Sequence, residues 1–270
     1  MVLGMLGLLE TDPEQVERAT AVFLWTFVGA LVMALVLGLA ARRLNISSGN
    51  HLIIWGVLLF ANIGSVIIEG FFIVPDLVSN LWVSLAQQLL PCIVTAVLVY
   101  RLFAPRQAET ERTAVAAPDG VLHRAWYQWL WRYAASGATY LAAYWVFGAI
   151  NFALVTRPYY EAQGSPLDVP DPQITLQAEL IRAALIVLSL LPFLLTAQMP
   201  IRRLAVWSSL LLFIIGSIVP LTWQAGMLAL PLLLASAVEI FFQNFTTGVV
   251  AALLLAWPVT DTVAIRLRHT

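Results

Sequence analysis

The polar residues of the last apolar segment are those whose types and spacing could do chemistry. The segment 228–257 is largely apolar, and four of its polar residues recur at spacings of three and four: Ser236, Glu239, Gln243 and Thr247. On a helix this spacing places all four on one face. A carboxylate within a membrane-length helix costs about 2.5–3.5 kcal/mol to insert, so it normally faces protein or trapped water. Glu239 is therefore a candidate functional group.

The chemistry open to Glu239 follows from what its own segment lacks. Residues 228–257 contain no arginine and no histidine. A buried carboxyl group without a cation is expected to hold its proton at neutral pH. This favours a proton-titrating or cation-coordinating role, or equally a neutral hydrogen bond to Asn62 or to a glutamine.

Other apolar segments carry a second set of polar residues. Asn62, Ser65 and Glu69 share one helical face, and Arg182 lies in a later segment. An arginine at that depth needs a carboxylate, which makes Arg182 the natural counter-ion for Glu69. Glu179 competes for the same arginine, because residues at i and i+3 are neighbours on a helix.

Composition places the chain among integral membrane proteins. Its 270 residues are 61% hydrophobic and 11% charged, and the mean hydropathy is +0.87. Soluble domains average about 25% charged residues. A net charge of −1 gives no electrostatic surface for nucleic acid, and the single cysteine, Cys92, excludes an intrachain disulfide.

The apolar segments predict an all-α bundle of seven transmembrane helices in one domain, residues 1–270. Each segment supplies the roughly 20 residues that a membrane crossing needs; they are 21–41, 52–73, 81–103, 126–155, 174–199, 204–222 and 228–257. The last segment could be one tilted helix or two short helices broken near Pro231. The connectors read as an outer N-terminal segment (1–20), a flexible cytoplasmic loop (104–125) and an outer loop (156–173).

Arginines in the connectors predict the orientation. The odd-numbered loops and the C-terminal tail hold ten of them: Arg42, Arg43, Arg101, Arg106, Arg112, Arg124, Arg202, Arg203, Arg266 and Arg268. The N-terminal tail and the even-numbered loops hold Arg18 and Arg157. Because arginine-rich loops stay in the cytoplasm, we expect the N-terminus outside the cell membrane and the C-terminus in the cytoplasm.

The expected outer surface is acidic. It carries Glu10, Asp12, Glu14, Glu17, Asp76, Glu161, Asp168 and Asp171. Such a set is either a solvated surface or a mouth that concentrates cations.

Given this orientation, the intramembrane polar residues sort by depth. Five are expected in the outer half of their helices, namely Glu69, Gln87, Gln88, Asn151 and Arg182, whereas Glu239 and Asn62 lie nearer the middle. We therefore predict an outward-facing polar cavity with a candidate ion or proton site made from Glu239, Gln243, Asn62, Glu69, Arg182, Gln88 and Asn151. The alternative is that the amides only join helices by hydrogen bonds, and that Glu69 is hydrated at the interface.

The residue inventory excludes several functional classes. The chain has no lysine, so it cannot form a retinal Schiff base. Its histidines, His51, His123 and His269, lie at or beyond the expected membrane borders, so no paired haem ligands and no HExxH zinc site are available. No aspartate lies within a predicted span. We expect neither cofactor nor metal.

Three functions remain open. The first is a small permease for a solute or proton, with Glu239 as the titratable group and the Glu69–Arg182 pair as a gate. The second is a non-catalytic subunit or scaffold, which would bind a membrane protein partner or a second copy of itself. The third is an intramembrane enzyme that works with carboxylates alone.

Overall fold

The computed structural model describes residues 13–44, 46–73, 80–105, 124–161, 171–197, 199–225 and 229–256. These residues form an all-helical structure with seven helices long and apolar enough to cross a membrane. The seven are Thr20–Ala41, Ser48–Ile73, Leu81–Phe103, Trp126–Tyr160, Pro172–Thr196, Ile201–Gln224 and Leu230–Ala256. The predicted all-α class and the number of long apolar helices are confirmed.

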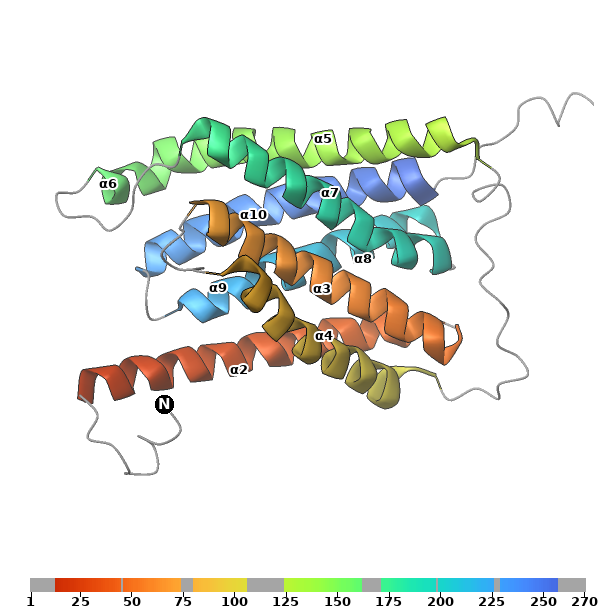
Figure 1. Ribbon diagram of the computed structural model, residues 1–270, viewed down its shortest axis with the longest axis horizontal. Helices are drawn as coiled ribbons and strands as arrows, with labels where there is room; N and C mark the ends of the chain where they lie inside the picture. The colour runs from red at the N-terminus through yellow and green to blue at the C-terminus, as the bar shows by residue number, and fades with distance from the viewer. Residues whose placement is uncertain are drawn as a thin grey trace, which may run out of the picture.

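The helices run along the long axis of the molecule and alternate in direction (Figure 1). In chain order they are α2 (Pro13–Ala41), α3 (Ser48–Ile73), α4 (Leu81–Phe103), α5 (Trp126–Asn151), α6 (Arg157–Tyr160), α7 (Pro172–Thr196), α8 (Ile201–Phe213), α9 (Val219–Gln224) and α10 (Leu230–Ala251). Helix α4 has the predicted bounds. Helix α3 begins before its apolar run, because Ser48 and its neighbours add a polar first turn.

Three π-helical segments interrupt or extend these helices. The first, η2 (Phe152–Thr156), joins α5 to α6; the second, η3 (Ile214–Ile218), joins α8 to α9; the third, η4 (Ala252–Ala256), continues α10. Segments of this kind are rare and are frequent near functional sites.

The last span is one helix. Pro231 lies in the first turn of α10, where a missing backbone N–H breaks no helical hydrogen bond. The alternative of two short helices broken near Pro231 is therefore wrong. Residues 228 and 257 of the predicted span lie outside the described residues.

Helix packing decides which side chains can meet. Helix α3 packs against α7 and α4, and α10 packs against α5 and α8. Helix α5 also packs against α7, while α2 packs against α9 and α4. Helices α3, α7, α5 and α10 therefore pack side by side in that order. All four carry intramembrane polar residues.

The two ends of the bundle differ in charge. One end, called here the arginine end, is where α2, α4 and α7 finish and α5 and α8 begin (Figure 1). It carries Arg42, Arg43, Arg101, Arg124, Arg202 and Arg203. The opposite end carries Arg157, Glu161 and Asp171. Several residues used to predict orientation lie outside the described residues: Glu10, Asp12, Asp76, Arg106, Arg112, Asp168, Arg266 and Arg268. So do most of the predicted connectors, 1–12, 106–123 and 162–170.

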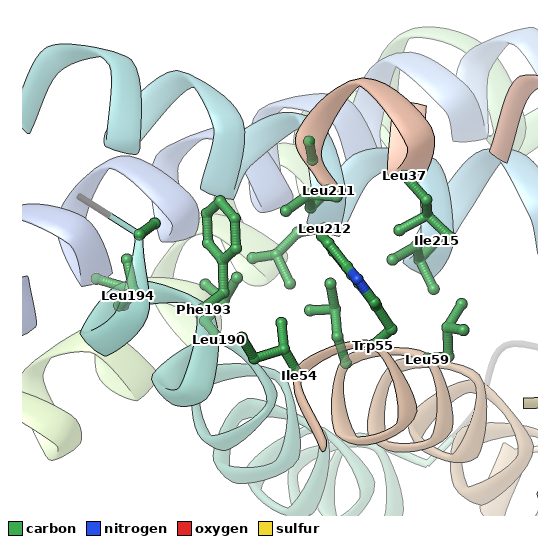
Figure 2. Close-up of a cluster of buried hydrophobic side chains, with 14 of the residues drawn as sticks. Leu37, Ile54, Trp55, Leu59, Leu190, Phe193, Leu194, Leu211, Leu212 and Ile215 are labelled. Atoms are coloured by element: carbon green, nitrogen blue, oxygen red, sulfur yellow. The ribbon is translucent and has the colours of Figure 1, made fainter. Parts of the chain in front are cut away.

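A cluster of buried apolar side chains, called here the dry core, fills the half of the bundle nearer the arginine end. Its largest fully buried side chains include Trp55 of α3, Phe193 of α7 and Leu211 of α8. Figure 2 shows them converging with Leu37, Ile54, Leu59, Leu190, Leu194, Leu212 and Ile215. The indole N–H of Trp55 donates to His51 Nδ1 at 3.2 Å, so its polar atom is satisfied inside this core.

Large apolar side chains also cover the outside of the bundle. Trp82, Trp126 and Leu154 are among the most exposed, each at 75% or more. Continuous apolar exposure of this kind is what helices need when they face lipid. Together with the seven long apolar helices, it suggests a multi-pass membrane protein.

Candidate functional site

Arg182 of α7 is bound by two glutamates at once. Its Nη1 lies 2.7 Å from Glu69 Oε2 on α3 and 2.8 Å from Glu179 Oε1 on α7. Both of the pairings that the sequence allowed for Arg182 are therefore present, and they share one nitrogen atom. The Arg182 side chain is 7% exposed, so this ion-pair group lies inside the bundle.

Tyr140 of α5 completes the surroundings of Glu179. Its hydroxyl donates to Glu179 Oε2 at 2.8 Å, and the Arg182 guanidinium lies over its ring at 5.9 Å. Both oxygens of Glu179 therefore have partners, and its side chain is fully buried at 0% exposure. The side chain of Glu69 is 28% exposed, so the two carboxyl groups bound to Arg182 differ sharply in exposure.

Local sequence explains how α7 presents this pair. Asp171 caps the helix by accepting from the backbone N–H of Gln173 at 2.6 Å, and Pro172 follows at the first helical position. Starting from this fixed N-terminus, the i, i+3 spacing of Glu179 and Arg182 keeps the two side chains on one face. Packing of α7 against α3 and α5 then brings Glu69 and Tyr140 to that face.

Glu239 of α10 lies in a second hydrogen-bonded group. Gln243 Nε2 donates to Glu239 Oε1 at 2.8 Å, and Asn151 Nδ2 donates to Glu239 Oε2 at 2.5 Å. Glu239 is half-buried, whereas Gln243 is buried. Both oxygens of this carboxyl group are thus held by amide donors rather than by a cation.

A glycine lets α5 approach this carboxyl group closely. A Cβ atom built at Gly148 would lie 3.3 Å from Glu239 Oε1. That separation is tighter than an ordinary van der Waals contact, so any larger residue would crowd the carboxyl group. The hydrogen bond from Asn151, one turn further along α5, depends on the same approach.

The two groups belong to one electrostatic unit, called here the carboxylate cluster. It comprises Glu69, Tyr140, Asn151, Glu179, Arg182, Glu239 and Gln243. Glu239 interacts electrostatically with Glu179 and Arg182. Tyr144 of α5 and Tyr160 of α6 each interact with both Glu69 and Glu239.

The charge of the carboxylate cluster is unbalanced. It contains three carboxyl groups and one guanidinium group. Surplus negative charge in a low-dielectric interior is costly, so protons or another cation must balance it. Among the residues that the structure describes, no three His, Cys, Asp or Glu side chains are placed to hold a metal ion.

Two predicted site residues lie elsewhere. Asn62 Nδ2 donates to the Leu58 carbonyl at 2.7 Å and to Ser189 Oγ at 2.8 Å, so Asn62 links α3 to α7 and is not bonded to Glu239. Gln88 is half-exposed on α4, which packs against α3 and α2. Among the described residues it forms no hydrogen bond with the carboxylate cluster.

Sequence reasoning missed three contributors. Glu179 was expected only as a competitor of Glu69, whereas Arg182 binds both; Tyr140 and Gly148 were not expected to take part. A usable signal exists, because Tyr140, Tyr144, Gly148 and Asn151 follow one side of α5 at spacings of three and four. That pattern marks a polar stripe but does not say which neighbour the stripe faces.

A separate arginine pair fixes the arginine end. Arg124 Nη1 donates to the Leu255 carbonyl at 2.6 Å, and Arg132 Nη1 donates to the Leu254 carbonyl at 2.5 Å. These carbonyls lie in the last turn of η4. Burial, and to a lesser extent the charge of Arg132, lower the pKa of Arg124 to about 10, so Arg124 stays charged at neutral pH. We assign this pair to anchoring α5 on the end of α10–η4.

Comparison with protein-family models, with curated proteins and with solved structures found no match. Function must therefore be inferred from the side chains of the carboxylate cluster.

Proposed function

We propose that this protein is a small membrane permease that exchanges protons, or a solute together with protons, at the carboxylate cluster. One observation carries the proposal: inside the bundle Glu69 of α3 and Glu179 of α7 both bind Arg182, and a third carboxyl group, Glu239 of α10, is held by amides without a cation. Purely structural hydrogen bonding between helices needs no surplus charge. Intramembrane ionisable residues that face protein are typical of ion and proton pathways.

The orientation of the proposed permease follows from its arginines. The arginine end is in the cytoplasm and the opposite end faces outward, because arginine-rich loops are retained on the cytoplasmic side. The membrane is the cell membrane. The carboxylate cluster then lies in the outer half of the bundle, because Glu69 is about one turn from the end of α3.

The proposed access route runs from outside. Glu69, at 28% exposed, and the half-buried Glu239 are the acidic members that a proton or solute can reach. The dry core around Trp55 and Phe193 closes the route toward the cytoplasm. The described conformation is thus one that loads from outside, and transport requires the packed half to open.

Proton flux into liposomes tests the proposal. The full-length chain is reconstituted with a pH-sensitive dye inside, and an inward proton gradient is imposed. We expect the wild-type protein to acidify the lumen faster than protein-free liposomes, and Glu239→Gln to insert normally but reduce the rate to that background. The matched control is Glu161→Gln, an exposed glutamate at the same end of the bundle. It should leave the rate unchanged. Equal rates for wild-type protein and Glu239→Gln would remove Glu239 from the mechanism.

A further inference from the structure

The two carboxyl groups that meet at Arg182 are close to each other as well as to the arginine. Glu69 Oε2 and Glu179 Oε1 lie 2.7 and 2.8 Å from the same Nη1 atom, so the two carboxyl groups are neighbours. An ionised carboxylate only accepts hydrogen bonds. Two carboxyl groups can therefore hydrogen-bond to each other only when one of them holds a proton.

Charge balance also requires that one of the two carboxyl groups holds a proton. With one proton shared by the two carboxyl groups, the trio of Glu69, Glu179 and Arg182 is neutral; without it, the trio carries a net charge of −1. Among the described residues that interact with Glu69, helix α7 brings Glu179 and Arg182, α5 brings Tyr140 and Tyr144, α6 brings Tyr160 and α10 brings Glu239. Arg182 is the one cation in this set, and it already has two carboxylate partners.

The surroundings of the two carboxyl groups decide which one exchanges the proton. Glu179 is fully buried at 0% exposure, and Tyr140 and Arg182 each donate to one of its oxygens, so it has no exposed oxygen from which a proton could leave. Glu69 is 28% exposed and lies about one turn from the end of α3. Glu239 is already held by two amide donors, one on each oxygen, and is not bonded to Arg182.

We propose that Glu69 and Glu179 share one proton beside Arg182, and that Glu69 is the carboxyl group through which this proton is exchanged with water. Release breaks the O–H bond of Glu69 and passes the proton to a water molecule at the exposed side. Glu69 then remains as a carboxylate in its existing contact with Arg182. Glu179 and Tyr140 act as positioning residues, because they hold Arg182 in place in both protonation states. The shared proton does not depend on transport, but its role in proton flux rests on the proposed function.

Infrared spectroscopy of the full-length protein in liposomes at neutral pH tests this assignment. A protonated carboxylic acid has a carbonyl stretch distinct from the carboxylate bands, and this stretch shifts in heavy water. We expect the wild-type protein to show this band with at least the area of one carboxyl group. Glu69→Gln should lose the area of one carboxyl group, and Glu239→Gln should keep that area. If Glu69→Gln does not fold, Glu69→Asp should retain the band at a shifted frequency.

A tyrosine pair provides the matched control for the positioning role. The Tyr140 hydroxyl donates to Glu179, whereas the Tyr133 hydroxyl donates to the Ala184 carbonyl across the same α5–α7 interface, at 2.5 Å. Tyr140→Phe should shift the frequency of the band, because the proton moves toward a Glu179 that has lost a donor. Tyr133→Phe should leave the band unchanged.

Two results would overturn the assignment: no protonated band in the wild-type protein at neutral pH, or a band that survives in Glu69→Gln and disappears in Glu239→Gln. The predicted infrared pattern in a protein that gives no proton flux would remove the proposed permease function and leave the shared proton standing. Proton flux in a protein that lacks the predicted infrared pattern would remove the shared proton and leave the proposed permease function standing.

Discussion

At the residue scale, the three glutamates of the carboxylate cluster differ in what satisfies their oxygens. Glu179 is bonded by a tyrosine hydroxyl and an arginine, Glu239 by two amides, and Glu69 by the shared arginine while it stays partly exposed. Hydrogen bonds donated to a carboxylate favour its ionised form, and desolvation opposes it. Identical side chains can therefore divide into fixed and exchanging groups within one cluster.

The close approach of Gly148 to Glu239 predicts the effect of adding a methyl group beside this carboxyl group. Gly148→Ala places a methyl group against Glu239 Oε1 and should displace the carboxyl group from Asn151. A lost hydrogen bond to a charged group is worth about 1.5–3 kcal/mol, so we expect proton flux in liposomes to fall by about tenfold or more. Gly137→Ala on the same helix is the control, because its added methyl group would meet Ala183 Cβ at an ordinary 3.8 Å. A Gly148→Ala protein with wild-type flux would show that the geometry of Glu239 is not critical.

Residue types and spacing predicted part of the carboxylate cluster. The Glu69–Arg182 ion pair was predicted, because a membrane arginine needs a carboxylate. The hydrogen bond from Gln243 to Glu239 agrees with their i, i+4 spacing. Asn62 could not be placed in the same way. Periodicity shows which face of α3 it occupies, but only packing shows that Ser189 of α7 meets that face.

At the element scale, the length of the apolar runs predicted where the long helices lie but not where π-helical segments interrupt them. Runs of about 20 apolar residues define membrane-length helices without knowledge of their neighbours. The π-helical segments η2 and η3 were not predicted, because an extra residue per turn leaves no change in hydropathy. Helix adjacency, such as α10 between α5 and α8, depends on side-chain packing that hydropathy does not encode.

Close packing of α8 on α10 supports an element-scale prediction. A Cβ at Gly248 would lie 2.5 Å from the backbone nitrogen and Cα of Ser209, and backbone atoms cannot move aside cheaply. Gly248→Ala should therefore force the two helices apart and destabilise the protein by about 1–3 kcal/mol. Thermal unfolding in detergent measures this as a lower midpoint.

Gly56 of α3 supplies the control for that measurement. A Cβ at Gly56 would meet nothing within 4 Å among the described residues. Gly56→Ala should leave the unfolding midpoint unchanged or raise it, because alanine favours a helix by about 0.5–1 kcal/mol over glycine. An unchanged midpoint in Gly248→Ala would contradict the close α8–α10 contact.

At the scale of the whole molecule, polar and apolar interiors are segregated along the bundle. The carboxylate cluster occupies the half away from the arginine end, and the dry core occupies the half next to it. Two further hydrogen bonds join neighbouring segments: Asn62 of α3 donates to Ser189 of α7, and Asn244 of α10 donates to Ser217 of η3, each at 2.8 Å. In the proposed permease, the bundle loads from one side, and its packed half must rearrange before anything crosses.

Water access to residue 239 tests the central claim most directly. In a Cys92→Ala background, which removes the buried native cysteine, Glu239→Cys is compared with Val238→Cys, whose native side chain is 58% exposed on the outside of α10. Intact cells or sealed liposomes are treated with a small, membrane-impermeant, cationic thiol reagent. We predict rapid labelling of Glu239→Cys from the outer side and none of Val238→Cys, which faces lipid. No labelling at residue 239, or labelling only from the cytoplasmic side, would contradict a carboxylate cluster that opens outward.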